Sequence, residues 1–185
     1  VVPEHPAERA NPDISPLAPS PGDVIITGRE VWEDQVVVLE GNLIVEAGGN
    51  LTLRNTTLYV RCHYEGQYGV EVRSGGALHV LGGSNITAWD LANPFRFLVR
   101  AGSTFEMRDS ELHGCGFSGE HPGLIIRASG AVLANAVLSH NYYGISVVGG
   151  QAVLEGCLLT ANYKGVYCEG GANVTARSCS VIGNW

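Results

Sequence analysis

The sequence has little charge and no long apolar run. Only 16% of its 185 residues are charged, and the formal net charge is −7. A nucleic-acid-binding protein needs a basic face to displace counterions from phosphates, so this composition argues against nucleic acid as a partner. No segment approaches the roughly 20 apolar residues that cross a bilayer, which predicts no membrane span.

Metal-binding motifs are also missing. The sequence has no CxxC pair, no HExxH motif and no EF-hand loop. One methionine is too few for a Met-rich copper site. The six histidines are scattered along the chain, at positions 5, 63, 79, 113, 121 and 140. We therefore expect no metal ion and no cofactor.

The sequence is rich in glycine and in short apolar segments. It has 25 glycines without collagen periodicity, and 45% of its residues are hydrophobic. Short runs of Val, Ile and Leu between Gly, Asn and Asp are typical of strands joined by tight turns. The first predicted strands are Val24–Thr27, Val36–Leu39, Leu43–Glu46 and Leu51–Leu53. No segment shows a helical period, which excludes folds that join parallel strands through helices.

An arm precedes these strands. Residues 1–22 contain six prolines and no periodic apolar pattern. We predict a Pro-rich N-terminal arm there and one domain over residues 23–185. We expect the arm to dock on another surface.

The domain is built from repeats. Three segments 21 residues apart begin at Gly123, Gly144 and Gly165. Each reads as strand, turn of small residues, strand, polar corner and strand. Looser copies of the same plan begin earlier in the chain, at Leu43, Val70 and Phe97. Repeats of this length are the signature of a solenoid.

Two columns of the aligned repeats describe the interior. One column is aliphatic in every repeat: Leu58, Ile86, Leu112, Leu138, Leu159 and Val181. The column two residues earlier is small in every repeat: Thr56, Ser84, Ser110, Ala136, Cys157 and Cys179. Residues two apart on a strand share a face, so both columns point inward and stack along the axis. The sequence thus predicts an all-β fold, a right-handed parallel β-helix of about six coils.

Turn-rich insertions separate the early repeats. They cover residues 61–68, 88–96 and 114–122. We expect them to project as loops from one side of the solenoid, where a binding face would lie.

The segments Asn141–Ile145 (NYYGI) and Asn162–Val166 (NYKGV) resemble the N-x-x-G-[IV] turn of the right-handed parallel β-helix repeat family. That family includes NosD-like proteins and, more distantly, pectate lyases and polygalacturonases. The opening IITGREVWEDQVVVLEGNLIVEAGGNLTLRNTTL, from Ile25, is similar to the first coils of archaeal extracellular members. The resemblance covers Val24 to Trp185 and implies the fold, but not a single function. Members often have Asn in the small column, so we expect the internal Asn ladder to be largely missing here.

One cluster is a candidate for acid–base chemistry. Asp109, Glu111 and His113 alternate with inward residues, so we expect them on one outward face, with His121 and Arg127 nearby. The alternative is an ordinary solvated strand face. The catalytic sets of polygalacturonases have no counterpart in this chain.

The five cysteines suggest covalent links. Cys157 and Cys179 should stack in neighbouring coils about 4.8 Å apart, within the range that a disulfide accepts. The alternative is two buried thiols in a tight corner. Because the count is odd, at least one cysteine is unpaired or bonded to another chain. Cys62 and Cys115 lie at loop edges and are candidates for such an intermolecular bond.

Aromatic residues and sequons complete the surface features. Tyr142, Tyr163 and Trp185 share one phase and either form a sugar-binding platform or stack on one another. Four Asn-x-Thr sequons, all with Thr, favour a secreted glycoprotein on the cell surface or outside the cell; they are at Asn50, Asn55, Asn85 and Asn173.

Two functions follow. The first is an extracellular structural protein that assembles head to tail with copies of itself into a filament, sheath or surface layer. The arm (Val1, Val2, Pro3) and the last repeat (Trp185), which ends without a polar cap, would make the contacts. The second is a carbohydrate-active enzyme or a glycan-binding module of the pectate-lyase-like type.

Overall fold

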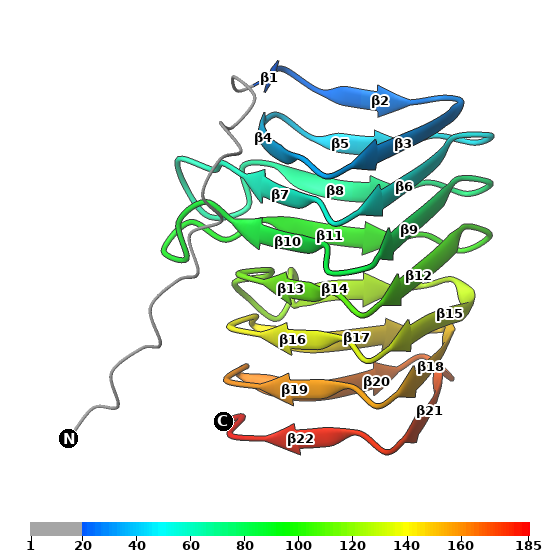
Figure 1. Ribbon diagram of the computed structural model, residues 1–185. Helices are drawn as coiled ribbons and strands as arrows, with labels where there is room; N and C mark the ends of the chain where they lie inside the picture. Colours follow the sequence, from blue (N-terminus) through cyan, green and yellow to red (C-terminus); the bar gives the residue numbers. More distant parts are fainter. Residues whose placement is uncertain (1–19) are drawn as a thin grey trace.

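The computed structural model describes residues 20–185, and these residues form a parallel β-helix (Figure 1). The chain winds through three parallel sheets in turn, so that each coil contributes one strand to each sheet. Each strand inside a sheet pairs with the strands one coil before and one coil after it, and the strands at the two ends of each sheet have one such neighbour. The predicted fold class is therefore confirmed.

The three sheets, called A, B and C, have these strands. Sheet A contains β1 (Ser20–Pro21), β4 (Val36–Glu40), β7 (Thr57–Val60), β10 (Asn85–Ala88), β13 (Glu111–His113), β16 (Val137–Ser139), β19 (Leu158–Thr160) and β22 (Ser180–Ile182). Sheet B contains β2 (Val24–Ile26), β5 (Leu43–Val45), β8 (Gly69–Val72), β11 (Arg96–Val99), β14 (Gly123–Ile126), β17 (Tyr143–Val148) and β20 (Lys164–Glu169). Sheet C contains β3 (Arg29–Glu33), β6 (Asn50–Arg54), β9 (Ala77–Leu81), β12 (Thr104–Arg108), β15 (Ser129–Ala134), β18 (Gln151–Glu155) and β21 (Asn173–Arg177).

The described residues make seven coils, one more than the repeats suggested, because β2, β3 and β4 form a coil of their own. Strand β3 (REVWE) is largely exposed and carries charged residues, so it lacks the apolar alternation that reveals a strand. The coil also lacks the double-glycine turn of the next two coils. Ahead of it, β1 pairs in parallel with β4, although Ser20 and Pro21 fall within the predicted arm. The rest of the arm, with its predicted docking, lies outside the described residues.

The two predicted interior columns are confirmed. The aliphatic residues pair in register from coil to coil, as Leu58 with Ile86, Ile86 with Leu112 and onward to Val181. All of them except Val181 are fully buried. The small column is also buried, from Thr56 through Cys157. The hydrophobic core is thus one continuous rod along the solenoid axis.

A sharp corner joins sheet C to sheet A in each coil. The residue at this corner has a left-handed backbone, with φ between 43° and 62°; it is Asp34, Asn55, Gly82, Asp109, Asn135, Gly156 or Ser178. Asn, Asp and Gly tolerate this conformation best. Two pairs of neighbouring corners are bonded to each other, since the Asn55 and Asn135 amides donate to Asp34 and Asp109 at 2.7 and 3.0 Å.

An internal Asn ladder is present, contrary to the expectation from the small column. It runs through Asn141, Asn162 and Asn184, at the corner between sheets A and B. The amide oxygen of Asn162 accepts from the backbone N–H of Asn141, and that of Asn184 accepts from the N–H of Asn162, both at 3.0 Å. Each amide nitrogen donates inward to the carbonyl of Leu112, Leu138 or Leu159. The ladder therefore satisfies backbone groups that no strand pairs.

Replacing Asn162 with alanine tests the importance of this ladder. Asn162 is fully buried and makes hydrogen bonds in both directions along the axis. We expect Asn162→Ala to lower the free energy of unfolding by about 2–4 kcal/mol, because it leaves buried backbone groups without partners. Chemical denaturation measures the change. Asn173→Ala, at an exposed position of β21, is the control and should change stability by less than about 0.5 kcal/mol. Equal effects of the two substitutions would contradict the role of the ladder.

Candidate ligand-binding groove

One column of paired side chains runs along the outer face of sheet B, with one register shift between Gly123 and Ile125. From the second coil onward these side chains are Ile44, Glu71, Leu98, Ile125, Ser146 and Tyr167. The three aliphatic members are half-buried although they point away from the core. They form the floor of a groove of about 420 Å³, a volume within the usual range of ligand sites.

One rim of the groove is a ladder of arginines. Arg73, Arg100 and Arg127 each follow a sheet B strand, and each backbone N–H bonds to the coil before it. Their side chains therefore begin at the same phase in three successive coils, spaced about 4.8 Å per coil. Glu46 occupies this phase one coil earlier and pairs with Arg73 at 2.5 Å. Such a stack of like charges is unfavourable unless anions lie beside it.

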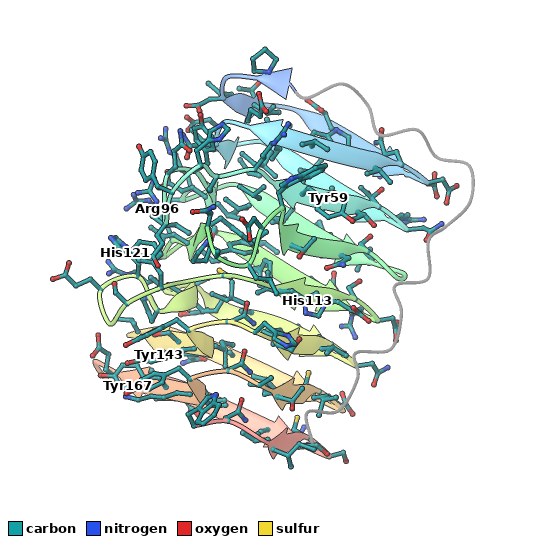
Figure 2. All side chains as sticks on the ribbon, turned by 90° about the vertical axis from the view of Figure 1, so that its left-hand side faces the viewer. Tyr59, Arg96, His113, His121, Tyr143 and Tyr167 are labelled. Atoms are coloured by element: carbon teal, nitrogen blue, oxygen red, sulfur yellow. The ribbon has the colours of Figure 1, made fainter. Side chains whose placement is uncertain are left out.

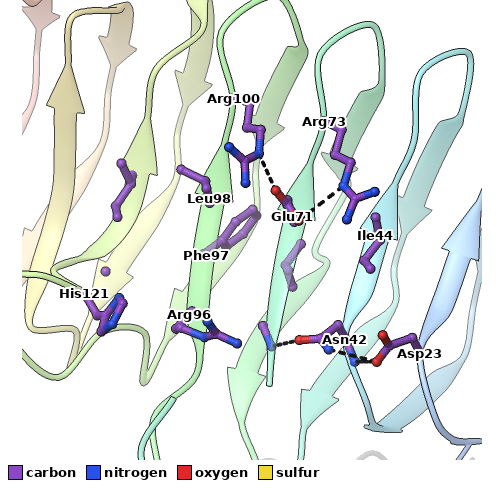
Figure 3. Close-up of a pocket in the computed structure, with 14 residues that line it drawn as sticks. Asp23, Asn42, Ile44, Glu71, Arg73, Arg96, Phe97, Leu98, Arg100 and His121 are labelled. Atoms are coloured by element: carbon purple, nitrogen blue, oxygen red, sulfur yellow. Dashed lines mark hydrogen bonds and ion pairs between the residues drawn. The ribbon is translucent and has the colours of Figure 1, made fainter. Parts of the chain in front are cut away.

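The carboxylate of Glu71 sits between two members of the arginine ladder (Figure 3). It pairs with Arg73 Nε at 3.4 Å and with Arg100 Nε on its other side. The Arg73 and Arg100 side chains remain 42% and 50% exposed, so both guanidinium groups still have free donors facing solvent. Arg127 forms no ion pair or hydrogen bond through its side chain with the described residues. The rim thus keeps an excess of positive charge.

The opposite wall consists of the predicted loops, all at the corner from sheet A to sheet B. They stack on one another, since Gly66 N–H bonds to Pro94 O at 2.7 Å and Gly116 N–H to Phe95 O at 2.8 Å. Gly66 packs against the ring of Phe117, where a Cβ atom would lie only 2.4 Å from the ring. Its φ of +68° also favours glycine. The prediction that these loops project from one side is therefore confirmed (Figure 1).

Arg96 and His121 project from this wall toward the groove (Figures 2 and 3). The ring of His121 lies 5.0 Å from that of Phe117, which orients it. Arg96 is exposed and makes no ion pair with any residue in the described part. At the first end of the groove, Asp23 accepts from the backbone and side-chain N–H groups of Asn42, both at 2.8 Å.

A second, smaller hollow of about 110 Å³ continues the groove toward the last coils. Ile125 borders both hollows, and Arg127, Tyr143, Ser146 and Tyr167 border the second. Ser146 is 1% exposed, and its hydroxyl has no hydrogen-bond partner among the described residues. A buried hydroxyl of this kind costs free energy unless a ligand or water completes it.

Tyrosines gather at this end of the molecule. The rings of Tyr142 and Tyr163 stack with centroids 4.9 Å apart, so these two members of the predicted phase do stack on one another. Tyr143 and Tyr167 lie nearer the groove, and Lys164 sits over both rings at 4.8 and 5.1 Å (Figure 2). A hydrogen bond with Tyr143 raises the pKa of Lys164, which keeps its positive charge.

The predicted acid–base cluster is divided by the structure. Glu111 and His113 lie together on the outer face of sheet A, with Nε2 of His113 2.8 Å from the Glu111 carboxylate. Asp109 does not share their face, because it occupies the left-handed corner and accepts from Asn135. His121 and Arg127 border the sheet B groove instead. The expectation that Asp109 shares the outward face of Glu111 and His113 was wrong, because the strand alternation stops at the corner.

The sequence reasoning missed the arginine ladder. Its members are 27 residues apart, as Glu46 and Arg73 are. The early coils therefore repeat with a step of 27 residues, which the 21-residue alignment of the last coils did not show. A search for charged residues at the longer step would have found the rim.

All five cysteines are free thiols in the structure. Cys62 and Cys115 are 4% and 0% exposed, and burial raises the pKa of both thiols. Their burial contradicts the interpretation of these two as intermolecular partners, because they point into the core at the loop edges. Cys168 is the exposed one. Cys157 and Cys179 occupy neighbouring coils as expected, and burial raises the pKa of the Cys157 thiol.

The four sequons are spread over the surface and stay predictions. Asn55 and Asn173 are exposed, and Asn50 and Asn85 are half-buried. No group of three His, Cys, Asp or Glu side chains gathers as metal ligands within residues 20–185. The same part of the chain has no helix long and apolar enough to cross a membrane.

These features define a parallel β-helix with a ligand-sized groove on one sheet. The chain matches the family described as right-handed β-helix region over residues 41–185, and it belongs to that family. Comparison with curated proteins and with solved structures gave no match.

Counting thiols tests the predicted bond between Cys157 and Cys179. Under an oxidising, extracellular-type environment we expect a thiol reagent to label three cysteines of the denatured protein, because two of the five are bonded to each other. Cys157→Ser should then leave four cysteines and free all of them. Labelling of all five in the unaltered protein would mean that the corner holds two thiols.

Proposed function

We propose that the protein is an extracellular glycan-binding β-helix whose sheet B groove holds an acidic oligosaccharide. The observation that carries this proposal is the arginine ladder along one rim of the groove. The rim offers Arg73 and Arg100, Arg127 continues the row beside the second hollow, and Arg96 faces the row from the loop wall. A chain of sugars with regularly spaced carboxylates or sulfates matches such a row of guanidinium groups.

The charge distribution supports an anionic ligand. The whole sequence has a net charge of −7 and only 11 basic residues. Four of these 11 border the two hollows, compared with four of the 18 acidic residues, Asp23, Glu71, Glu120 and Glu169. The hollows thus hold a larger share of the basic residues than of the acidic ones, which favours anions there over the rest of an acidic surface.

The residues of the groove floor favour a sugar as the ligand rather than an isolated anion. Ile44, Leu98 and Ile125 offer apolar surface to the C–H faces of sugar rings, while Ser146 offers an unused hydroxyl. Tyr143 and Tyr167 extend the apolar surface at the far end. The groove follows the solenoid axis across successive strands, so an elongated ligand fits it better than a compact one.

The groove favours binding over bond cleavage. Its carboxylates are engaged, since Glu71 pairs with two arginines and Asp23 accepts from Asn42. An extracellular location agrees with the predicted sequons and with a surface glycan as ligand.

Arginine substitutions test this proposal. We expect Arg127→Ala to weaken binding of an acidic oligosaccharide such as an oligogalacturonate about tenfold, because one charge-assisted contact is lost. Calorimetry measures the affinity, which should also fall as salt is added. Arg54→Ala, on the outer face of sheet C, is the matched control and should leave binding unchanged. An affinity that changes neither with salt concentration nor in Arg127→Ala would exclude the groove as the binding site.

Self-assembly is a second candidate, favoured by the surface of the last described coil. Val181, Ile182 and Trp185 are 50%, 60% and 91% exposed there, and β20, β21 and β22 are edge strands. Apolar edges of this kind pair with a further coil. In the proposed filament, sheath or surface layer, a second copy would supply that coil, together with the Pro-rich arm.

Light scattering tests the assembly. We expect the mass in solution to rise with concentration above that of one chain, and Ile182→Lys to return it to the mass of one chain by placing a charge on the exposed edge. Thr104→Lys, at an exposed position of β12 in the middle of sheet C, is the control. A constant monomer mass at all concentrations would exclude assembly through this surface.

A further inference from the structure

A row of hydrogen-bonded side chains lies on the outer face of sheet A, whereas the groove lies on sheet B; Figure 2 labels His113 of this row. Glu111 and His113 come from β13, and Ser139 comes from β16 one coil later. His113 and Ser139 are register partners, so their side chains stand side by side. Nε2 of His113 lies 2.8 Å from the Glu111 carboxylate, and Nδ1 lies 2.7 Å from the Ser139 hydroxyl.

The hydrogen bonds determine which imidazole nitrogen carries the proton. An ionised carboxylate only accepts, so Nε2 of His113 must donate to Glu111. Neutral His113 then has its lone pair on Nδ1, facing the hydroxyl of Ser139. The hydroxyl proton therefore points at a base that is held in the right tautomer. This order of nucleophile, base and orienting carboxylate is the general arrangement of an activated serine.

A second histidine completes the surroundings of Ser139. Nδ1 of His140 lies 3.0 Å from the Ser139 hydroxyl oxygen. Because that hydroxyl donates to His113, it accepts from His140. The backbone of His140 is held at φ +56°, which places its ring beside the preceding residue. Ser139 is only 5% exposed, so a reactant must be small to reach its oxygen.

From this geometry we infer a second, acyl-transfer site, in which Ser139 is the nucleophile for esters of short carboxylic acids. Ser139 Oγ forms a bond to the ester carbonyl carbon while Nδ1 of His113 takes the hydroxyl proton. His140 Nδ1–H donates to Ser139 Oγ and so helps to hold that oxygen in place for the attack. The C–O bond to the alcohol then breaks, and His113 returns the proton to the leaving oxygen. Water attacks the acyl-serine by the same route and releases the carboxylic acid.

The roles of the three residues differ. Ser139 and His113 touch the reacting atoms, whereas Glu111 is a positioning residue that acts through His113. The site shares no residue with the sheet B groove, so a negative result for glycan binding would not count against the acyl-transfer site.

The experiment uses p-nitrophenyl acetate with the whole chain. We expect release of p-nitrophenol together with one acetyl group on the peptide that contains Ser139, located by mass spectrometry. Ser139→Ala should abolish this acetylation, and His113→Ala should slow it about 100-fold. Ser180→Ala, an exposed serine of β22 on the same sheet, is the matched control and should react as the unaltered protein does.

Two variants of Glu111 distinguish its positioning of His113 from an effect on the stability of the protein. Glu111→Gln keeps the size but lets an amide N–H donate to Nε2, so Nδ1 becomes protonated and acetylation should slow about 100-fold. Glu111→Asp keeps the accepting carboxylate and should restore most of the rate. The melting temperatures of the two variants should agree, since Glu111 is exposed.

The location of the acetyl group in the unaltered protein shows whether Ser139 is the nucleophile, even where a variant fails to fold. Acetylation confined to Ser139 supports the site. Acetylation only at Lys164 or at a histidine, or no acetylation at all, overturns it. A rate that is the same in Ser139→Ala as in the unaltered protein also overturns it.

Discussion

The structure depends on one interaction, the parallel hydrogen-bond ladder that joins each strand to its counterpart one coil away. Because the pairing is in register, a given position has the same surroundings above and below in coil after coil. A large residue at Leu58 is supported by Ile86, and Ile86 by Leu112. A long insertion within a strand would disrupt this pairing, so the long insertions lie at the corners, and only local register shifts occur within strand pairs, at Gly123–Ile125 and Ser129–Ala131.

The same constraint shapes the outer surface. A column that points outward is as ordered as one that points inward, but packing does not choose its residues. The outward column of sheet B can therefore combine Ile44, Glu71 and Leu98, which no core would accept together. Adjacent residues of one column lie about 4.8 Å apart by construction. A row of functional groups along the axis thus arises without any dedicated loop, as the arginine ladder and the pair of His113 and Ser139 both show.

Sequence reasoning predicted the interior better than the surface, for a physical reason. Burial restricts residue type, so the columns of Leu112 and Ser110 are visible in an alignment, and both were found. Surface columns accept many residue types, so Arg100 and Arg127 stand out only when residues are compared at the 27-residue step of the early coils. Asp109 was misplaced because alternation was extended through a left-handed corner. Strand β3 was missed because it contains charged residues such as Arg29 and Glu33 and has only one partly buried side chain, so it shows no apolar pattern.

The corner between sheets A and B explains why the loop wall runs along only part of the groove. In the last coils this corner is closed by Asn141, Asn162 and Asn184, whose side chains satisfy the backbone and leave a tight turn. In the earlier coils, inserted loops occupy the corner and satisfy one another, as Gly66 does with Pro94. Where the ladder begins, the wall ends, since Asn141 accepts from Cys115, just inside the last inserted loop. The number of coils that carry a loop wall is therefore set by where the Asn ladder begins. Removing a loop would not close the corner unless an asparagine replaced it.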